Sequence, residues 1–254
     1  MNGVDKKRAD KSRGLSRFFG AHRFTCVCCG ADVFDDSGIC DFCLPRLLFN
    51  NGKTCARCGA ALGDVDNRFC AACEKFDEVF FDGAASAFVY GGETSRLILK
   101  MKYGGAKYLS EFFARFMAKK FFTLSVGFDL AIPVPMTKSA KKKRGYNQAE
   151  LLTAEFCDII EADFRFDLLE KVRETPQQET LGFKQRRENL KGAFSAKRDA
   201  TLEGKRILLI DDVKTTGATI NLCAKALKKA GAAYVFALTA ASSRDIAATE
   251  RDLI

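Results

Sequence analysis

The chain has 254 residues, of which 47% are hydrophobic and 29% charged, a composition that excludes a largely disordered or fibrous protein. Its 41 Lys and Arg against 32 Asp and Glu give a net charge of +9, which favours phosphate-rich partners, either a nucleic acid or a nucleotide-like ligand. The longest weakly polar stretch, residues 230–241, is shorter than the roughly 18 apolar residues of a membrane span, so we expect no membrane insertion.

The amino-terminal segment, residues 1–23, is basic. It carries seven Lys and Arg against two Asp and lacks the apolar centre of a secretory signal, so we expect a disordered basic tail and a cytoplasmic protein. His22 is the only histidine, which almost excludes imidazole as a metal ligand or as an acid–base group.

The next segment, residues 24–77, is rich in cysteine. Eight of the eleven cysteines form four C-x-x-C pairs, namely Cys26/Cys29, Cys40/Cys43, Cys55/Cys58 and Cys70/Cys73. Such spacing in a cytoplasmic chain is typical of metal ligands, and two pairs complete one tetrahedral Zn²⁺ site. Four thiolates leave no open coordination position, so we expect the zinc to be structural.

An internal repeat divides these pairs. The pattern Cys-x-x-Cys-Gly-Ala at 26–31 recurs at 55–60, which predicts two successive zinc ribbons and two Zn²⁺ ions. Gly30 and Gly59 stand where a positive φ turns backbone N–H groups toward sulfur. An interleaved pairing of the four C-x-x-C pairs stays open, and Cys28 is a competing ligand. A redox function is the weaker alternative because redox sites use a single pair.

From about residue 78 the pattern alternates between strands and helices. Strands are expected at 80–90, 130–134, 164–169, 206–210 and 234–239, and helices at 94–102, 107–122, 148–160 and from the turn at 211–217 to Gly231. Asn147 is the expected cap of the third helix, and Cys157 and Cys223 are expected core residues. Basic loop 136–147 and polar segment 173–191 separate these elements. The order predicts an α/β domain over 78–254 with an open, mainly parallel sheet and flanking helices.

The string at 207–219, ILLIDDVKTTGAT, has the features of a ligand loop. It places Asp211 and Asp212 at the carboxyl end of a buried strand, where open α/β sheets bind ligands. Adjacent carboxylates can accept hydrogen bonds from two ribose hydroxyls, and loop N–H groups at a helix start suit a phosphate. The expected phosphate-binding residues are Thr215, Thr216, Gly217, Ala218 and Thr219. A plain strand–turn–helix joint is the alternative, but it requires neither the two acids nor the three threonines.

Other motifs stand along the chain: Lys102-Tyr103-Gly104, Pro133-Val134-Pro135, Arg144-Gly145-Tyr146-Asn147-Gln148, and Arg173 with Thr175, Gln178, Leu181, Arg186, Asn189 and Phe194. With the two ribbons, they make the chain resemble the ComF family of competence proteins over residues 26–243. The string at 207–219 resembles the phosphoribosyl pyrophosphate (PRPP) motif of type I phosphoribosyltransferases. Two residues depart from the family pattern: Tyr146 stands where Phe is more frequent, and Lys214 stands at a position that is usually apolar.

The resemblance implies a type I phosphoribosyltransferase fold and a site for PRPP with Mg²⁺. Asp211, Asp212 and the loop 215–219 are then the PRPP-binding residues. Pyrophosphate is a highly charged leaving group, which cations and N–H donors stabilise as its bond breaks. The candidates for this contact are Lys102, Arg144, Gly145, Arg173 and Arg186. No general base stands out, so catalytic residues and the acceptor are not assigned.

Three functions fit these observations: a phosphoribosyltransferase that releases pyrophosphate, a PRPP or nucleotide sensor without turnover, and a competence factor in DNA uptake. The third would bind single-stranded DNA or other competence proteins. The ribbons hold few basic residues, so the tail and the loop 138–144 are the better DNA candidates. We also expect loss of Cys55 to unfold the amino-terminal region and to spare much of the α/β domain. The sequence does not indicate an oligomeric state.

Overall fold

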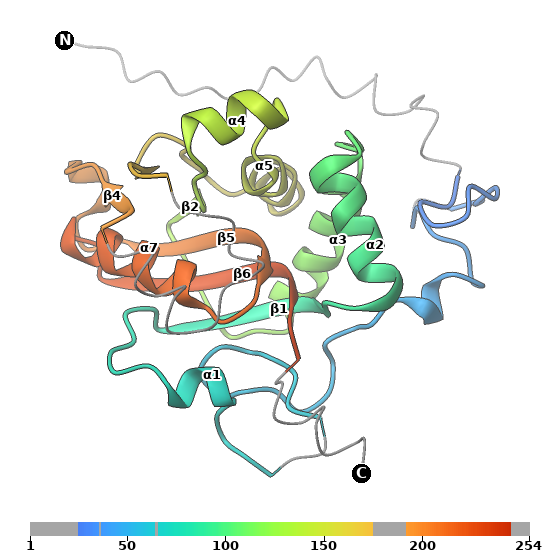
Figure 1. Ribbon diagram of the computed structural model, residues 1–254, viewed down its shortest axis with the longest axis horizontal. Coiled ribbons are helices and arrows are strands. Elements are labelled where there is room, and N and C mark those ends of the chain that lie inside the picture. The colour runs from blue at the N-terminus through green and yellow to red at the C-terminus, as the bar shows by residue number, and fades with distance from the viewer. Residues whose placement is uncertain (1–24, 36, 64–65, 175–191, 245–254) are drawn as a thin grey trace. The chain divides into compact units, whose positions relative to one another are not determined.

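The computed structural model describes residues 25–35, 37–63, 66–174 and 192–244 (Figure 1). The expected tail and most of the polar segment 173–191, including Arg186, lie outside these residues. In the described part, no helix has the length and apolar character needed to cross a membrane. By packing, the chain divides into two compact units, Met1–Pro45 and Arg46–Ile254. The short 3₁₀ helix η3 (Leu44–Arg46) contains the point of division.

The second unit is built on a four-stranded sheet in the order β1-β6-β5-β2. All three pairings are parallel, and the strands are β1 (Gly83–Val89), β6 (Tyr234–Ser242), β5 (Arg206–Lys214) and β2 (Leu130–Pro133). In the central register, Ile210 lies between Pro133 and Leu238. The strands are buried along most of their length, as in a parallel sheet covered on both faces. The predicted open parallel sheet is confirmed.

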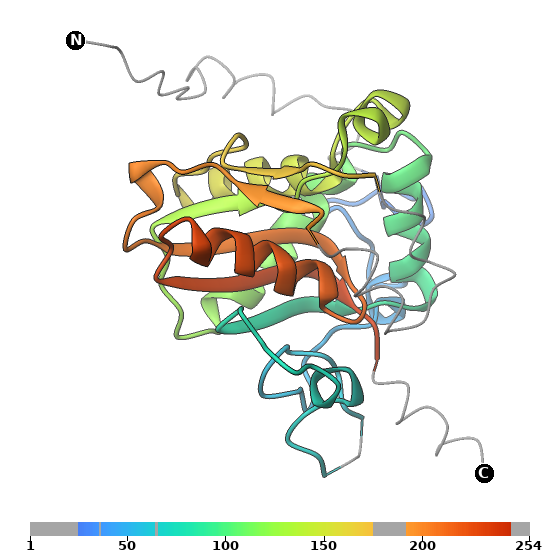
Figure 2. The ribbon, with the colours of Figure 1, turned by 60° about the vertical axis from the view of Figure 1, so that its left-hand side comes forward.

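Helices cover both faces of this sheet. Figure 2 shows α7 (Ala218–Lys229) in front of the strands, with α3 (Leu109–Phe122) and α5 (Gln148–Ile160) behind them. The apolar residues of α3 and α5 pack on the sheet because their spacing gathers them on one side of each helix. Phe88 of β1, for example, contacts the rings of Phe113 and Phe116. Cys157 and Cys223 are buried in the core, as predicted.

Three local predictions were wrong. The expected loop 136–147 contains helix α4 (Lys138–Arg144), which the Thr137 hydroxyl caps by accepting from the Ala140 N–H, and which Gly145 ends at φ 85°. This helix has no apolar stripe and escapes a search for hydrophobic periodicity. Strand β5 extends to Lys214, so Asp211 and Asp212 lie in the strand and not in the turn after it.

The expected strand at 164–169 is also displaced. Phe164 makes only an isolated bridge to Ala131, and β3 runs over Leu169–Lys171. β3 pairs antiparallel with β4 (Phe194–Ala196) in a separate two-stranded sheet. The 3₁₀ helix η5 (Ala200–Leu202) then leads into β5.

The edge of the main sheet at β1 is covered by the chain that leads into the second cysteine repeat. Residues Leu48 and Asn50 exchange backbone hydrogen bonds with β1, at 2.7 Å to Val89 and 3.0 Å to Ala87. The Asn50 amide also donates to the Gly59 carbonyl at 2.8 Å. A Cβ on Gly59 would lie 2.4 Å from the Ala84 carbonyl oxygen, so only glycine permits this approach. This contact fixes the second repeat against the sheet.

The core of the second unit includes the second repeat. Cys55, Leu62 and Cys73 belong to the same buried cluster as Ile220 and Leu227 of α7, and the short helix α1 (Ala71–Glu74) carries Cys73. The two predicted ribbons therefore fall in different compact units. The predicted modules 24–77 and 78–254 themselves stay a prediction.

Candidate functional site

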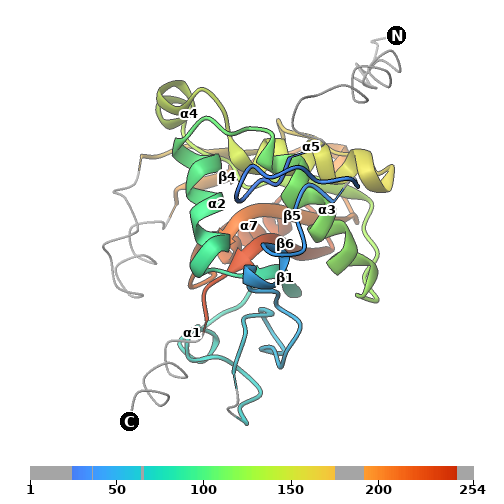
Figure 3. The same cartoon turned by 90° about the vertical axis from the view of Figure 1, so that its right-hand side faces the viewer.

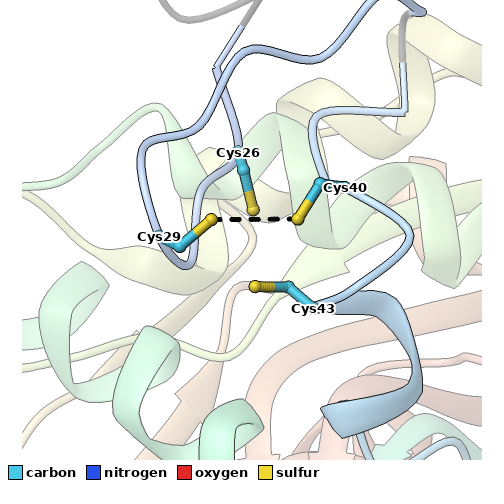
Figure 4. Close-up of side chains that lie close together, drawn as sticks. All are labelled: Cys26, Cys29, Cys40 and Cys43. Carbon is cyan, nitrogen blue, oxygen red and sulfur yellow. Dashed lines mark hydrogen bonds between the residues drawn. The ribbon is translucent and has the colours of Figure 1, made fainter.

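Each cysteine repeat brings four sulfur atoms together. The groups are Cys26, Cys29, Cys40 and Cys43, drawn in Figure 4, and Cys55, Cys58, Cys70 and Cys73, and within each group all sulfurs lie within 4.8 Å of one another. The Sγ atoms of Cys29 and Cys40 are 3.8 Å apart, and those of Cys58 and Cys70 are 3.5 Å apart. Tetrahedral zinc with bonds of about 2.3 Å requires about 3.8 Å between sulfurs. The donors fit zinc, and sequential pairing is confirmed over the interleaved alternative.

The backbone around the two groups repeats almost bond for bond. The N–H of the first cysteine donates to the alanine five residues later, Cys26 to Ala31 at 2.7 Å and Cys55 to Ala60 at 2.8 Å. Gly30 and Gly59 have φ values of 76° and 64°, as predicted. Cys28, the candidate competitor, does not belong to either group. Both repeats thus build the same knuckle from the same sequence.

The two groups differ in burial. In the first, Cys29 is exposed and Cys40 partly exposed, whereas all four cysteines of the second are at most 3% exposed. Three N–H donors surround the second group: the Cys70 amide lies 3.3 Å from Cys55 Sγ, Lys214 Nζ lies 3.5 Å from Cys58 Sγ, and the Arg57 guanidinium donates to the Cys73 carbonyl. The hydrogen bond with Cys55 acts to raise the pKa of Cys58. Hydrogen bonds with Cys70 and Cys73 and the positive charge of Lys214 outweigh it and lower this pKa to about 6.

The candidate ligand loop lies at the carboxyl end of β5, where the strand passes into α7. Gly217 is the N-cap residue of α7 with φ 81°, so the cap residue itself has no side chain with which to bond the first-turn N–H groups. The Ala218 N–H has only a long contact, 3.4 Å, to Thr216 Oγ1. The Ser243 hydroxyl donates to the Thr215 carbonyl at 3.1 Å, which connects the end of β6 to the loop. The start of α7 therefore offers N–H donors and a positive dipole end to an anion.

The two acids of the loop differ in their environment. Asp212, only 7% exposed, lies 3.1 Å from Lys102 Nζ at the end of α2 (Gly92–Tyr103). Burial and the neighbouring charge of Asp212 raise the pKa of Asp211 to about 8, although Lys102 opposes this. Burial acts to lower the pKa of Lys102, but the two carboxylates raise it above its usual value. Lys102 and Asp212 therefore form an ion pair. Any hydrogen-bond donor that approaches Asp211 would stabilise its ionised form.

The motif at 144–148 supports the end of α2. The Tyr146 hydroxyl donates to the Met101 carbonyl, and the Gln148 amide approaches the Lys102 carbonyl at 3.4 Å. The Arg144 guanidinium lies over the Tyr103 ring, 5.0 Å from its centre, and Figure 3 shows α4 beside this end of α2. These contacts place Lys102 next to the acids. The Tyr146 hydroxyl also gives a reason for the departure from Phe, since Phe lacks a donor for Met101.

The same motif reaches the sheet. Asn147 caps α5 by accepting from the Ala149 N–H, as predicted, and its amide donates to the Val134 carbonyl at 3.1 Å. The Val134 N–H in turn donates to the Ile210 carbonyl, one residue before Asp211. The predicted motifs at 102–104, 133–135, 144–148 and 211–219 thus form one connected assembly.

The remaining candidates for contact with pyrophosphate are Arg144, Gly145, Arg173 and Arg186, and the last of these lies outside the described residues. Arg144 donates to Gln148 Oε1 at 2.7 Å, and Arg173 lies two residues after β3. The contact of Arg144, Gly145, Arg173 and Arg186 with pyrophosphate stays a prediction. Sequence reasoning missed the contact between Lys214 and Cys58. The signal was the departure of Lys214 from the pattern of the family that the sequence resembles, and its partner is 156 residues away in the sequence.

Curated relatives resemble the chain over most of its length, although no family model matches it. The chain is 30% identical over 216 residues to "Competence protein F" of Haemophilus influenzae, covering 82% of this chain and 92% of that protein. It is 26% identical over 239 residues to "Competence protein ComFC" of Bacillus subtilis, covering 84% and 92%. It is 26% identical over 203 residues to "DNA utilization protein YhgH" of Salmonella typhi, covering 78% and 87%.

Solved structures give weaker similarities. Adenine phosphoribosyltransferase from Thermoanaerobacter pseudethanolicus matches with a TM-score of 0.36 and 17% identity, covering 57% of this chain and 84% of that chain. Glutamine PRPP amidotransferase from B. subtilis matches with a TM-score of 0.36 and 17% identity, covering 52% and 26%. TM-scores this low carry no argument about function.

Proposed function

Since the chain belongs to the ComF family of competence proteins, we propose that it binds PRPP with Mg²⁺ at the carboxyl end of β5 and supports DNA uptake in the cytoplasm. The observation that carries this proposal is the Lys102–Asp212 pair beside the start of α7. It provides two carboxylates, one cation and a helix N-terminus within one assembly. A ribose that carries phosphates on both sides requires this combination of groups.

In the proposed complex, the loop 215–219 binds the 5′-phosphate through backbone N–H groups and the helix dipole. Asp211 and Asp212 accept hydrogen bonds from the ribose hydroxyls. Burial raises the pKa of Asp211 in the free protein, and the ribose hydroxyls would favour its ionised form in the complex. Lys102 is the described cation nearest to the acids, and it is the proposed contact for pyrophosphate on the other side of the ribose.

A phosphoribosyl transfer at this site would break the bond between ribose C1 and pyrophosphate oxygen. The electron pair leaves with pyrophosphate, and the acceptor donates the pair that forms the new bond to C1. Lys102, joined by the arginine candidates, would stabilise the charge that develops on the leaving group. The described residues include no histidine, and neither the general base nor the acceptor is assigned. A PRPP sensor without turnover would use the same binding residues and release no pyrophosphate.

Helix α4 favours a second activity, binding of single-stranded DNA. Its side chains Lys138, Lys142 and Lys143 are exposed, whereas Lys141 pairs with Glu150 and Arg144 bonds Gln148. Three solvated ammonium groups on one short helix suit a phosphate backbone. This activity, and contacts with other competence proteins, can coexist with PRPP binding.

Calorimetric titration with PRPP in the presence and absence of Mg²⁺ tests the binding. A subsequent screen of candidate bases for pyrophosphate release distinguishes the enzyme from the sensor. Binding that requires Asp212 and is followed by base-dependent release supports the transferase. Binding without release for any base supports the sensor.

A further inference from the structure

Lys214 is a buried cation between the ligand loop and the second cysteine group. It is the last residue of β5, directly before Thr215, and its exposed fraction is 3%. Its ammonium lies 3.5 Å from Cys58 Sγ. A lysine with this burial requires an anionic partner, because an uncompensated charge is strongly disfavoured away from water.

Further contacts connect the same two regions. The Phe76 ring lies 3.9 Å from where a Cβ of Gly217 would be. The Asn221 side chain in the first turn of α7 accepts from the Phe80 N–H at 2.7 Å and donates to the Glu78 carbonyl at 2.9 Å. The segment that follows the second cysteine group therefore packs against the first turn of α7, where the loop ends.

The charges of the two regions are complementary. A zinc ion with four thiolates has a net charge of −2, and N–H donors to the sulfurs of such a site orient the ligands and stabilise the bound metal. Lys214 supplies one N–H donor and one positive charge from inside the protein. The cysteines of the first group have no contact of this kind with a lysine among the described residues.

We propose that Lys214 is a positioning residue that links the second zinc site to the ligand loop. The thiolates of the Cys55–Cys58–Cys70–Cys73 group, which would hold the zinc, accept a hydrogen bond from the Lys214 ammonium, and Lys214 in turn fixes the end of β5 from which Thr215 to Thr219 depart. The proposal that zinc supports PRPP binding rests on the proposed function. The proposal that zinc and loop order are coupled does not.

Such a linkage is reciprocal. If zinc orders the loop, then a ligand that orders the loop slows the loss of zinc from the second group. The first group, in the other compact unit, has no share in this coupling. Zinc release from the first group therefore serves as an internal control for zinc release from the second.

The test compares Lys214→Met with Lys214→Arg in the full zinc-loaded protein. Met keeps the length and apolar stem but removes the charge and the donor, whereas Arg keeps both. With a chromophoric chelator, Lys214→Met should release one of its two zinc ions about tenfold faster or more, with the other unchanged. Lys214→Arg should recover most of the difference. Lys229→Met, the control, removes an exposed lysine at the end of α7 and should leave both rates unchanged.

Hydrogen exchange of the amides at 211–219 reads loop order without PRPP. Lys214→Met should speed this exchange and Lys214→Arg should not. In wild type, removal of the first zinc ion by mild chelation should leave the loop protected, and removal of the second should expose it. Unchanged zinc release together with unchanged exchange in Lys214→Met overturns the linkage. A zinc-loaded wild type that shows this coupling but binds no PRPP contradicts the proposed function alone.

Discussion

Lys102 and Asp212 meet at 3.1 Å from opposite sides of the candidate site, one at the end of α2 and the other near the end of β5. Breaking the pair would leave a mostly buried charge without a partner, which is energetically costly. The pair therefore fixes α2 relative to the sheet edge where the loop begins. A ligand with hydroxyls and phosphates would find its partners already arranged.

Removal of the Asp212 carboxylate should weaken PRPP binding. We expect Asp212→Ala to lower the affinity by about 1.5–3 kcal/mol, the range for hydrogen bonds to a charged group. Asp158→Asn, an exposed acid on α5, is the control for the change of net charge and should leave affinity unchanged. Isothermal calorimetry measures both variants. Equal affinities of Asp212→Ala and wild type would reject the assignment of Asp212.

The stability of the ligand-free protein should depend on Asp211. Its pKa of about 8 in the folded protein exceeds the unfolded value of about 3.9, so the folded state holds a proton that the unfolded chain has lost. The free energy of unfolding should therefore fall as pH rises from about 4 to 8 through this group. The size of this decrease depends on the groups that face Asp211, which are Asp212, Lys102 and Cys223.

Asp211→Asn mimics the protonated form and should remove this contribution. The variant should be more stable than wild type at pH 8, and the difference should shrink as the pH falls toward 4. Urea unfolding of the zinc-loaded proteins across this range measures the slope. An identical pH dependence in the two proteins would show that Asp211 does not titrate in this window.

The two zinc groups should respond differently to mutation. Wild type should contain two zinc equivalents, and both Cys55→Ser and Cys29→Ser should contain one. Cys55 is buried in the core around Ile220, so its loss should lower the melting temperature of the sheet-containing unit. Cys29 is exposed in the other unit, and its loss should spare the sheet. Elemental analysis and thermal unfolding test this, and a wild type with one equivalent or none would refute the double site.

DNA binding should depend on α4 and the basic tail. Replacement of Lys138, Lys142 and Lys143 by Ser, or deletion of residues 1–22, should weaken single-stranded DNA binding and reduce the slope of log affinity against log salt. PRPP affinity should not change. If the slope of log affinity against log salt is the same in both variants as in wild type, then neither segment binds DNA. A role in competence would then depend on protein partners or on the PRPP site.

The sequence predicts the elements whose signals are local. The helix at 148–160 and its Asn147 cap can be predicted because the capping residue and the apolar spacing lie within one segment. The four C-x-x-C pairs and the string at 207–219 likewise carry their chemistry in adjacent residues. Motif order also predicts which loops contribute to the candidate site.

Contacts between distant segments could not be predicted. Nothing local shows that Cys55 belongs to the sheet-containing core, and its loss was therefore expected to spare the α/β domain. From the buried position of Cys55, we instead predict that its loss destabilises the sheet-containing unit. Lys214 similarly stood out as a departure from a pattern, but its meaning requires the position of Cys58. Helix α4 was missed because exposed lysines and capping residues, not apolar periodicity, define it.

Titration of the zinc-loaded wild-type protein with PRPP and Mg²⁺ in a calorimeter tests the central claim most directly. The account predicts saturable binding at one site per chain, weakened by Asp212→Ala and by Lys102→Met and unchanged by Asp158→Asn. Absence of saturable binding to a folded protein with two zinc equivalents would contradict it.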